Sequence, residues 1–199
     1  MAPQLKRHSL DRATFFRVVP EPLPTIRTER LVLRPFRQED APVVQRLAGA
    51  REVADTTLTI PHPYRDGEAE RWIATHEEAW RQRDRATFAI TTAADGLIGA
   101  IGLHLRLPHH RAELGYWIGF PFWNRGYATE AARAILAFGF ETLGLNRIHA
   151  SHLTRNPASG RVMEKAGMRF EGALRQHLVR RGKLEDLNEF AILRSERAV

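Results

Sequence analysis

The stretch at residues 113–130 constrains the fold most, because an apolar, aromatic run passes there through a glycine into a helix-forming sequence. Residues 114–120 are typical of a buried strand. Gly126 follows, and a helix-forming sequence begins at Tyr127. The N-terminus of such a helix offers unpaired backbone N–H groups and the positive end of the helix dipole, which suit a phosphate. Turns of this kind are common and most bind nothing, so the stretch alone leaves both interpretations open.

The length and composition predict one globular domain with a sizeable core, since 199 residues are 43% hydrophobic. Apolar runs stay well short of membrane-spanning length and the N-terminus lacks the apolar stretch of a signal peptide, so we expect a cytoplasmic protein with no membrane partner. The absence of cysteine excludes disulfides, thiolate metal sites and a cysteine nucleophile.

The formal net charge of +7 raises the question of a nucleic-acid partner. Only Lys6, Lys165 and Lys183 are lysines among 30 basic residues, which indicates a general arginine bias rather than a selected binding face. The excess also lies mainly in residues 1–37, and the body is close to neutral. We therefore expect no DNA partner. A basic, proline-containing extension at residues 1–25 is either a solvated tail or a contact to an acidic partner such as ribosomal RNA, with one domain at residues 26–199.

The order of the predicted elements describes a mixed α/β domain. An antiparallel front half is followed by a parallel strand–helix–strand crossover near the glycine turn. Asp40 and Asp66 are the predicted N-caps of two early helices, and Asp95-Gly96 predicts a hairpin. No His, Asp or Glu cluster has the spacing of metal ligands, so no metal is expected. The predicted strands are residues 28–35, 87–92, 97–105, 111–120, 146–153, 168–174, 176–180 and 184–193, and the later helices are 127–143 and 156–166.

Two separated motifs resemble one family. The run Trp123-Asn124-Arg125-Gly126-Tyr127-Ala128 resembles the pyrophosphate loop of the GNAT acetyltransferases, which reads Gln or Arg, two residues, Gly, any residue, Gly or Ala. Asn156-Pro157-Ala158-Ser159, followed by residues 162–168, is similar to that family's second cofactor motif. Further runs, at residues 28–34, 60–64, 113–118 and 182–186, are similar to the Rim-type branch, which acetylates N-terminal amines of ribosomal proteins. The resemblance covers roughly residues 26–195.

This resemblance implies the fold and the co-substrate. The fold would be a central, mostly antiparallel mixed sheet of about seven strands, splayed between the cofactor-bearing strand and the next and flanked by helices. Acetyl-CoA would be the acetyl donor. Two residues depart from the family pattern. Trp123 stands where Gln or Arg is general, and Met163 stands where many members carry a tyrosine that protonates the leaving thiolate.

Acetyl transfer from a thioester to an amine needs a base, stabilisation of the carbonyl oxygen and a weak acid. Glu113 is the first candidate base, directly or through a water, because it opens the strand that would carry the cofactor. A solvated or salt-bridged glutamate is the alternative, and Tyr116 and His104 are the reserve candidates. Backbone N–H groups near Trp117 or Ile118 are the candidates for the oxyanion and for pairing with the pantetheine arm.

The remaining candidate residues would hold the cofactor. Asn156 either only caps the following helix or also hydrogen bonds the pantetheine. By resemblance, Ser159 donates to the cofactor sulfur in place of the missing tyrosine, although a serine satisfied by the backbone is an open alternative. The candidates for the phosphates are Trp123, Asn124, Arg125, Gly126, Tyr127, Ala128 and Thr129.

The resulting hypothesis is an acetyl-CoA-dependent N-acetyltransferase that acts on a protein N-terminal amine, such as that of a ribosomal protein. One alternative acceptor is a small-molecule amine, either a polyamine, an amino acid or an antibiotic. A different class of protein, a non-catalytic acyl-CoA-binding regulator, would bind the cofactor without turnover. The chain would be a monomer or a homodimer.

Overall fold

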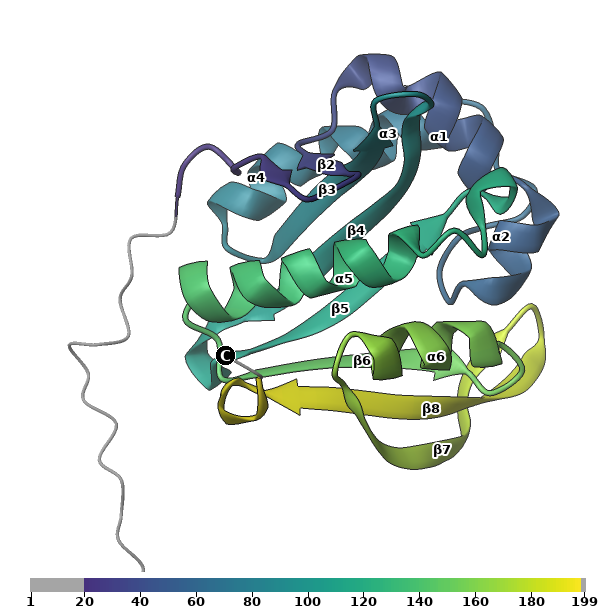
Figure 1. Cartoon of the computed structure of the whole chain (residues 1–199). Coiled ribbons are helices and arrows are strands. Elements are labelled where there is room, and N and C mark those ends of the chain that lie inside the picture. Colours follow the sequence, from purple (N-terminus) through teal and green to yellow (C-terminus); the bar gives the residue numbers. More distant parts are fainter. Residues whose placement is uncertain (1–19, 198–199) are drawn as a thin grey trace, which may run out of the picture.

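The computed structural model describes residues 20–197 and places eight strands in one sheet with the order β1-β2-β3-β4-β5-β6-β8-β7 (Figure 1). Only the β5–β6 pair within these residues is parallel. The strands are β1 Ile26–Arg27, β2 Val32–Arg34, β3 Arg85–Thr92, β4 Gly96–Arg106, β5 Arg111–Ile118, β6 Arg147–Leu153, β7 Arg169–Arg180 and β8 Lys183–Leu193. The helices are α1 Ala41–Ala48, α2 Arg51–Thr56, α3 Glu68–Ala74, α4 His76–Arg81, α5 Tyr127–Ala137 with a π-helical turn Phe138–Thr142, and α6 Pro157–Lys165.

Helices cover both faces of the sheet. The apolar sides of α5 and α6 pack on one face, where Ile135, Ile148 and Met163 belong to the larger core cluster. The helices α1 and α3 pack on the other face, where Val44 and Trp117 belong to a second cluster. This arrangement, with its mostly antiparallel mixed sheet between helices, confirms the predicted fold class.

Several predicted elements are confirmed because their signals are local. Asp95 and Gly96 connect β3 to β4 in the predicted hairpin. Asn156 caps α6, since its side-chain oxygen accepts a hydrogen bond from the Ser159 N–H at 3.4 Å. His76 is a packed core histidine, because its ring lies 4.4 Å from that of Trp72 and burial lowers its pKa to about 4.

The predicted strand at residues 28–35 begins too early, because residues 28–31 form a tight turn between β1 and β2 and the strand itself is Val32–Arg34. The Thr28 N–H donates to the Leu31 carbonyl at 2.9 Å, and the Leu31 N–H donates to the Thr28 hydroxyl at 3.0 Å. The Thr28 hydroxyl also lies 2.6 Å from the carboxylate of Glu130, far along the chain. That tertiary contact stabilises a turn where propensity predicts a continuous strand. β1 is an additional strand, whereas the predicted strands at residues 168–174 and 176–180 form one strand, β7, so the sheet has eight strands.

Two predicted caps and one loop are also corrected. Asp40 accepts hydrogen bonds from the guanidinium of Arg34 at 2.7 and 2.8 Å rather than capping α1 by its side chain. Asp66 accepts from the Gln45 amide at 2.6 Å, and α3 begins after Gly67. The expected loop at residues 55–63 begins later than predicted, because α2 extends to Thr56.

The sheet is splayed between β5 and β6, as predicted. The two strands pair only where residues 111–113 meet 147–149, and Figure 1 shows them diverging beyond that point. From Leu114 onward, the β5 edge that faces β6 has no strand partner among residues 20–197. Its backbone groups are therefore open to another partner.

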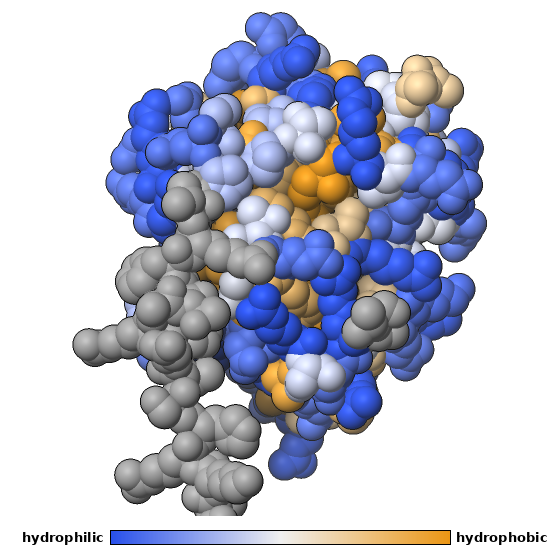
Figure 2. Space-filling view, turned by 60° about the vertical axis from the view of Figure 1, so that its left-hand side comes forward, coloured by the Kyte–Doolittle hydropathy of each residue, from blue (hydrophilic) through white to orange (hydrophobic). Residues whose placement is uncertain are grey.

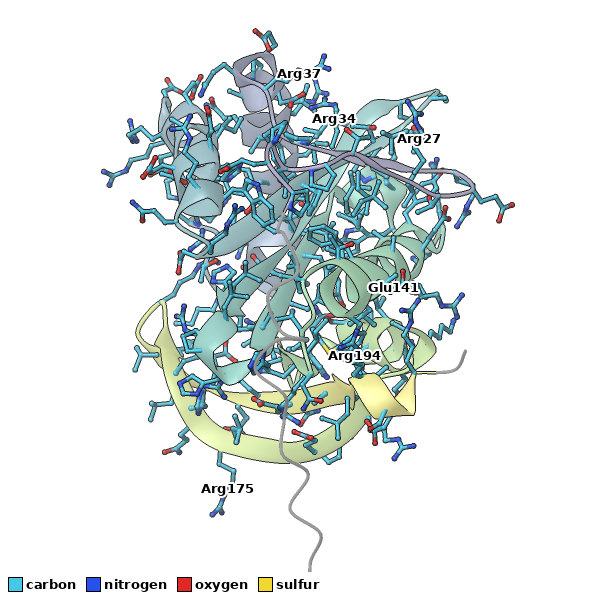
Figure 3. All side chains as sticks on the ribbon, turned by 90° about the vertical axis from the view of Figure 1, so that its left-hand side faces the viewer. Arg27, Arg34, Arg37, Glu141, Arg175 and Arg194 are labelled. Atoms are coloured by element: carbon cyan, nitrogen blue, oxygen red, sulfur yellow. The ribbon has the colours of Figure 1, made fainter. Side chains whose placement is uncertain are left out.

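Two views show where apolar residues and labelled arginines lie on the molecule. Figure 2 shows hydrophobic residues near the centre of one face, framed by hydrophilic ones. The arginines labelled in Figure 3 are dispersed, with Arg27, Arg34 and Arg37 near one end and Arg175 at the other. In the part of the chain that the structure describes, no helix is long and apolar enough to cross a membrane. The apolar patch at residues 15–19, considered as an edge strand, lies outside the described residues.

Candidate active site

A groove of about 290 Å³ lies between the end of β5, the turn before α5, and α6. It contains most of the residues that the sequence motifs indicate. The candidates that line it are Tyr116, Trp117, Ile118, Trp123, Asn124, Gly126, Tyr127, Ala128, Thr129, Asn156 and Ser159. Two motifs about 30 residues apart in the sequence therefore form opposite walls of one groove.

The N-terminus of α5 opens into this groove without a side-chain cap from the described residues. Gly126 precedes the helix with φ +79°, a left-handed conformation that glycine adopts without strain. The first backbone N–H groups of the helix are thus available for an anion. On the facing helix, Arg161 and Lys165 also line the groove and add positive charge.

Arg30 fixes the turn that precedes α5. Its backbone N–H and its Nε donate to the two oxygens of the Glu130 carboxylate at 2.9 and 2.7 Å. Its Nη1 donates to the Arg125 carbonyl at 3.0 Å, and its guanidinium lies 4.9 Å from the centre of the Tyr127 ring. Although burial alone would raise the pKa of Glu130, the bonds from Thr28 and Arg30 hold it below its ordinary value. Arg30 thereby offsets a negative charge beside the anion-binding end of the helix.

Two motif residues make contacts within the protein. The Trp123 indole N–H donates to the Ile118 carbonyl at 2.6 Å and connects the turn to the end of β5. The Arg125 side chain lies outside the groove lining, with its guanidinium 5.7 Å from the centre of the Phe122 ring.

A cavity of about 570 Å³ lies on the other side of β5, beneath α1, α3 and the segment at residues 57–61. Glu113 lies on its wall beside His104, its register partner on β4. Burial, followed by the nearby Arg85, lowers the pKa of His104 despite the opposing charge of Glu113. His104 is therefore neutral at neutral pH.

The groove and the cavity meet at Tyr116 and Ser159, which line both. The Tyr116 hydroxyl lies 2.7 Å from the Ser159 hydroxyl and donates to the Ser159 carbonyl at 3.2 Å. Burial raises the pKa of Tyr116 to about 12. A phenol that keeps its proton suits the role of a hydrogen-bond donor better than that of the base considered from the sequence.

Asn156 has both polar ends of its amide engaged within the protein. Besides capping α6, its Nδ2 donates to the Thr56 carbonyl at 3.2 Å, at the end of α2. Arg155 donates to the adjacent Asp55 carbonyl at 2.7 Å, and Arg180 donates to the Ala54 carbonyl. The C-terminus of α2 is thus attached to the α6 and β7 side of the molecule. This attachment brings Thr56 and Thr57 to the junction of groove and cavity.

Sequence reasoning missed the roles of several residues. Arg161 and Lys165 are four residues apart, so the pattern indicates that they share one side of α6. Thr56 and Thr57 gave no such signal, because their place depends on contacts with distant arginines.

Comparison with known families assigns the chain to one of them. The family model described as an acetyltransferase (GNAT) domain matches residues 30–169. The chain belongs to the GNAT family.

Individual relatives agree with this assignment. YoaA of Bacillus subtilis (strain 168), named as an uncharacterized N-acetyltransferase, is 32% identical over 173 residues, 86% of this chain and 97% of that protein. YdaF of the same organism, whose name assigns it provisionally to ribosomal N-acetyltransferases, is 37% identical over 101 residues, 50% of this chain and 55% of that protein. The crystal structure of a GNAT-family acetyltransferase from Bacillus anthracis is 28% identical with a TM-score of 0.77, covering 86% of this chain and 99% of that chain.

As a GNAT enzyme, the protein is an N-acetyltransferase that depends on acetyl-CoA. The groove fits this co-substrate, because the uncapped helix N-terminus, Gly126 and the cations of α6 suit its phosphates. Within residues 20–197 no group of three His, Cys, Asp or Glu side chains is arranged to hold a metal ion.

Replacing Arg30 by alanine is expected to raise the Kd for acetyl-CoA about 10-fold, because the turn before α5 loses charge-assisted hydrogen bonds that hold Glu130 and the Arg125 carbonyl. Isothermal titration calorimetry measures this change. The matched control is Arg81→Ala on α4, whose exposed ion pair with Glu77 is remote from the groove lining. Equal affinities for the two variants would show that Arg30 does not position the turn.

Proposed function

We propose that this enzyme transfers the acetyl group of acetyl-CoA to a primary amine that enters through the cavity, most specifically the N-terminal α-amine of a protein such as a ribosomal protein. The observation that carries the proposal is the junction at Tyr116 and Ser159, where the groove meets the cavity that contains Glu113. Donor and acceptor would thus approach from opposite sides of β5. The name of the relative YdaF supports the choice of a ribosomal acceptor.

The chain's own residues divide the work by position. Bound acetyl-CoA supplies an acetyl group activated as a thioester. Glu113 takes the proton of the incoming amine, directly or through a water. The lone pair on the amine nitrogen is then free to form the new amide bond with the acetyl carbon. The unpaired β5 edge near Trp117 and Ile118 offers N–H groups to the carbonyl oxygen. The Tyr116–Ser159 pair donates a hydrogen bond to the sulfur, which leaves as a thiolate when its bond to the acetyl carbon breaks.

The experiment that tests the proposal follows CoA release from acetyl-CoA with a panel of peptides with free N-termini, polyamines, amino acids and antibiotics bearing amines. Release with the peptides, ribosomal N-terminal sequences included, supports the proposal. Release with the small amines alone would move the acceptor to that class. Acetyl-CoA binding without release for any acceptor would favour the non-catalytic regulator.

Replacing Tyr116 by phenylalanine is expected to lower kcat by only about 10-fold. The loss is small because a thiol with a pKa near 8.5 is a good leaving group that needs little help from a donor. Ser159→Ala is expected to act in the same direction, and the double variant to lose little more, because the two hydroxyls act as a pair. Steady-state kinetics measures the effect. Ser195→Ala, at the exposed end of the described chain, is the control. Fully additive losses would contradict a shared role.

The arrangement of the whole protein stays a prediction. We infer that residues 26–199 form the single catalytic domain and that the basic extension at residues 1–25 is either a solvated tail or a ribosome contact. A cytoplasmic location and a monomeric or homodimeric state also remain predictions.

A further inference from the structure

A pair of glycines forms part of the cavity wall between the candidate base and the acetyl end of the groove. The register of β4 and β5 places three pairs in succession on this face of the sheet: His104 with Glu113, Gly102 with Gly115, and Ala100 with Trp117. Alternate residues of a strand point to the same face. The glycine pair lies between Glu113, the candidate base, and Trp117, near the acetyl end of the groove. The atoms of the acceptor next to its amine would therefore lie over the two glycines.

Packing accounts for Gly102 but not for Gly115. A Cβ atom on Gly102 would lie 2.5 Å from the Ala86 carbonyl oxygen, so any larger residue there would displace the backbone. A Cβ atom on Gly115 would meet no heavy atom within 4 Å among its surroundings in the described structure. A glycine inside a strand is destabilising and often marks a place where a ligand approaches the backbone closely. The space above Gly115 is open cavity.

The walls around this space are mainly apolar. Val44 and Ala48 of α1, Leu58 and Ile60 of the following segment, and Trp72 of α3 face the sheet across the cavity. Such walls suit an apolar substituent on the acceptor.

The charge of the cavity fits a single amine. Among the described residues that line it, the carboxylates are Glu68 and Glu113, and the Arg85 cation lies on the same wall. A polyamine would bring several positive charges to a cavity with little surplus negative charge. One ammonium group beside Glu113 is the better match.

We infer that the acceptor carries a bulky apolar group, of leucine to phenylalanine size, next to its primary amine, and that Gly115 is the residue that makes room for this group. The inference rests on the proposed function, because it takes the cavity as the acceptor site. The same chemistry is offered by a peptide that begins with leucine or phenylalanine and by a small apolar amine.

The test compares peptides that differ only in their first residue, either alanine, serine, leucine or phenylalanine, together with the corresponding amino acid amides and spermidine. For the wild-type enzyme we expect kcat/KM at least about 10-fold higher for leucine and phenylalanine than for alanine, which is the range that a few buried methylene groups give. A preference seen with peptides but not with amides identifies a protein acceptor. The reverse identifies a small amine. Higher kcat/KM for alanine, serine or spermidine would overturn the inference and leave the enzyme class intact.

Gly115→Val fills the space with a side chain that a strand tolerates well. We expect kcat/KM for leucine and phenylalanine to fall at least about 10-fold and that for alanine to change less than about threefold, with acetyl-CoA affinity unchanged. Gly172→Val on β7 is the matched control, because its Cβ also meets no heavy atom within 4 Å and it lies outside the cavity lining. A uniform loss for every acceptor, or no change, would overturn the role of Gly115.

A binding measurement separates the inference from the proposed function. Calorimetry with CoA present compares leucinamide with alaninamide in the wild type and in Gly115→Val. Tighter binding of leucinamide that Gly115→Val abolishes supports the inference even if no acceptor is acetylated. Equal binding of the two amides overturns it even if acetylation of other amines is observed.

Discussion

Replacing Glu113 by glutamine is expected to lower kcat about 10²- to 10⁴-fold, which is the usual contribution of a general base. Glutamine has nearly the same shape but does not accept the proton of the amine. Glu113 lines the cavity and is not part of the groove lining, so the Kd for acetyl-CoA should stay unchanged. Steady-state kinetics with a saturating amine, together with calorimetry for acetyl-CoA, measures both quantities.

The control for this variant is Glu77→Gln on α4, whose side chain is 79% exposed and which lies outside both the cavity and the groove linings. A wild-type rate for Glu113→Gln would remove Glu113 as the base. A large loss for His104→Gln in the same experiment would then assign the role to His104, which is already neutral and lies opposite Glu113.

Replacing Gly126 by valine is expected to raise the Kd for acetyl-CoA about 100-fold, which corresponds to about 2.7 kcal/mol. A residue with a Cβ is strained at φ +79°, and a β-branched residue is strained more. The new side chain also occupies the place where backbone N–H groups of α5 must approach a phosphate. Its Cβ would lie 3.3 Å from the guanidinium of Arg30, so the contact that positions the turn is disturbed as well.

Gly182→Val separates strain from the loss of the phosphate site. Gly182 has φ +74° in the turn between β7 and β8, and a Cβ there meets no heavy atom within 4 Å in the described structure. Both variants should lose stability in thermal unfolding, but only Gly126→Val should lose affinity in calorimetry. Equal affinities in the two variants would remove the argument that the N-terminus of α5 binds the cofactor.

The parts of the fold that the sequence predicts are those with a local cause. The Asp95-Gly96 turn, the cap at Asn156 and the apolar side of α5 each depend on residues within one turn or hairpin. The predicted strand at residues 28–35 begins too early, because Thr28 and Arg30 in the preceding turn bond Glu130, about 100 residues further on. Strand propensity depends on local sequence and does not account for a bonding partner so far along the chain.

The candidate site divides in the same way. The motifs around Gly126 and Asn156 predict the two walls of the groove, because a phosphate-binding turn is formed by residues that are adjacent in the sequence. The cavity has no such motif, since its wall combines β3, β4 and β5 with α1, α3 and the segment at residues 57–61. The contact between Tyr116 and Ser159 likewise depends on how β5 and α6 meet in space. It changes the expected role of Tyr116 from a reserve base to a donor.

The short β5–β6 pairing leaves the two parts of the sheet with few backbone contacts between them. Three pairs of residues join the five strands before the splay to the three strands after it. A pantetheine arm bonded to the open edge of β5 supplies the lateral contacts that a complete strand would otherwise make. If the co-substrate pairs with this edge as proposed, it also braces the two parts of the sheet against each other.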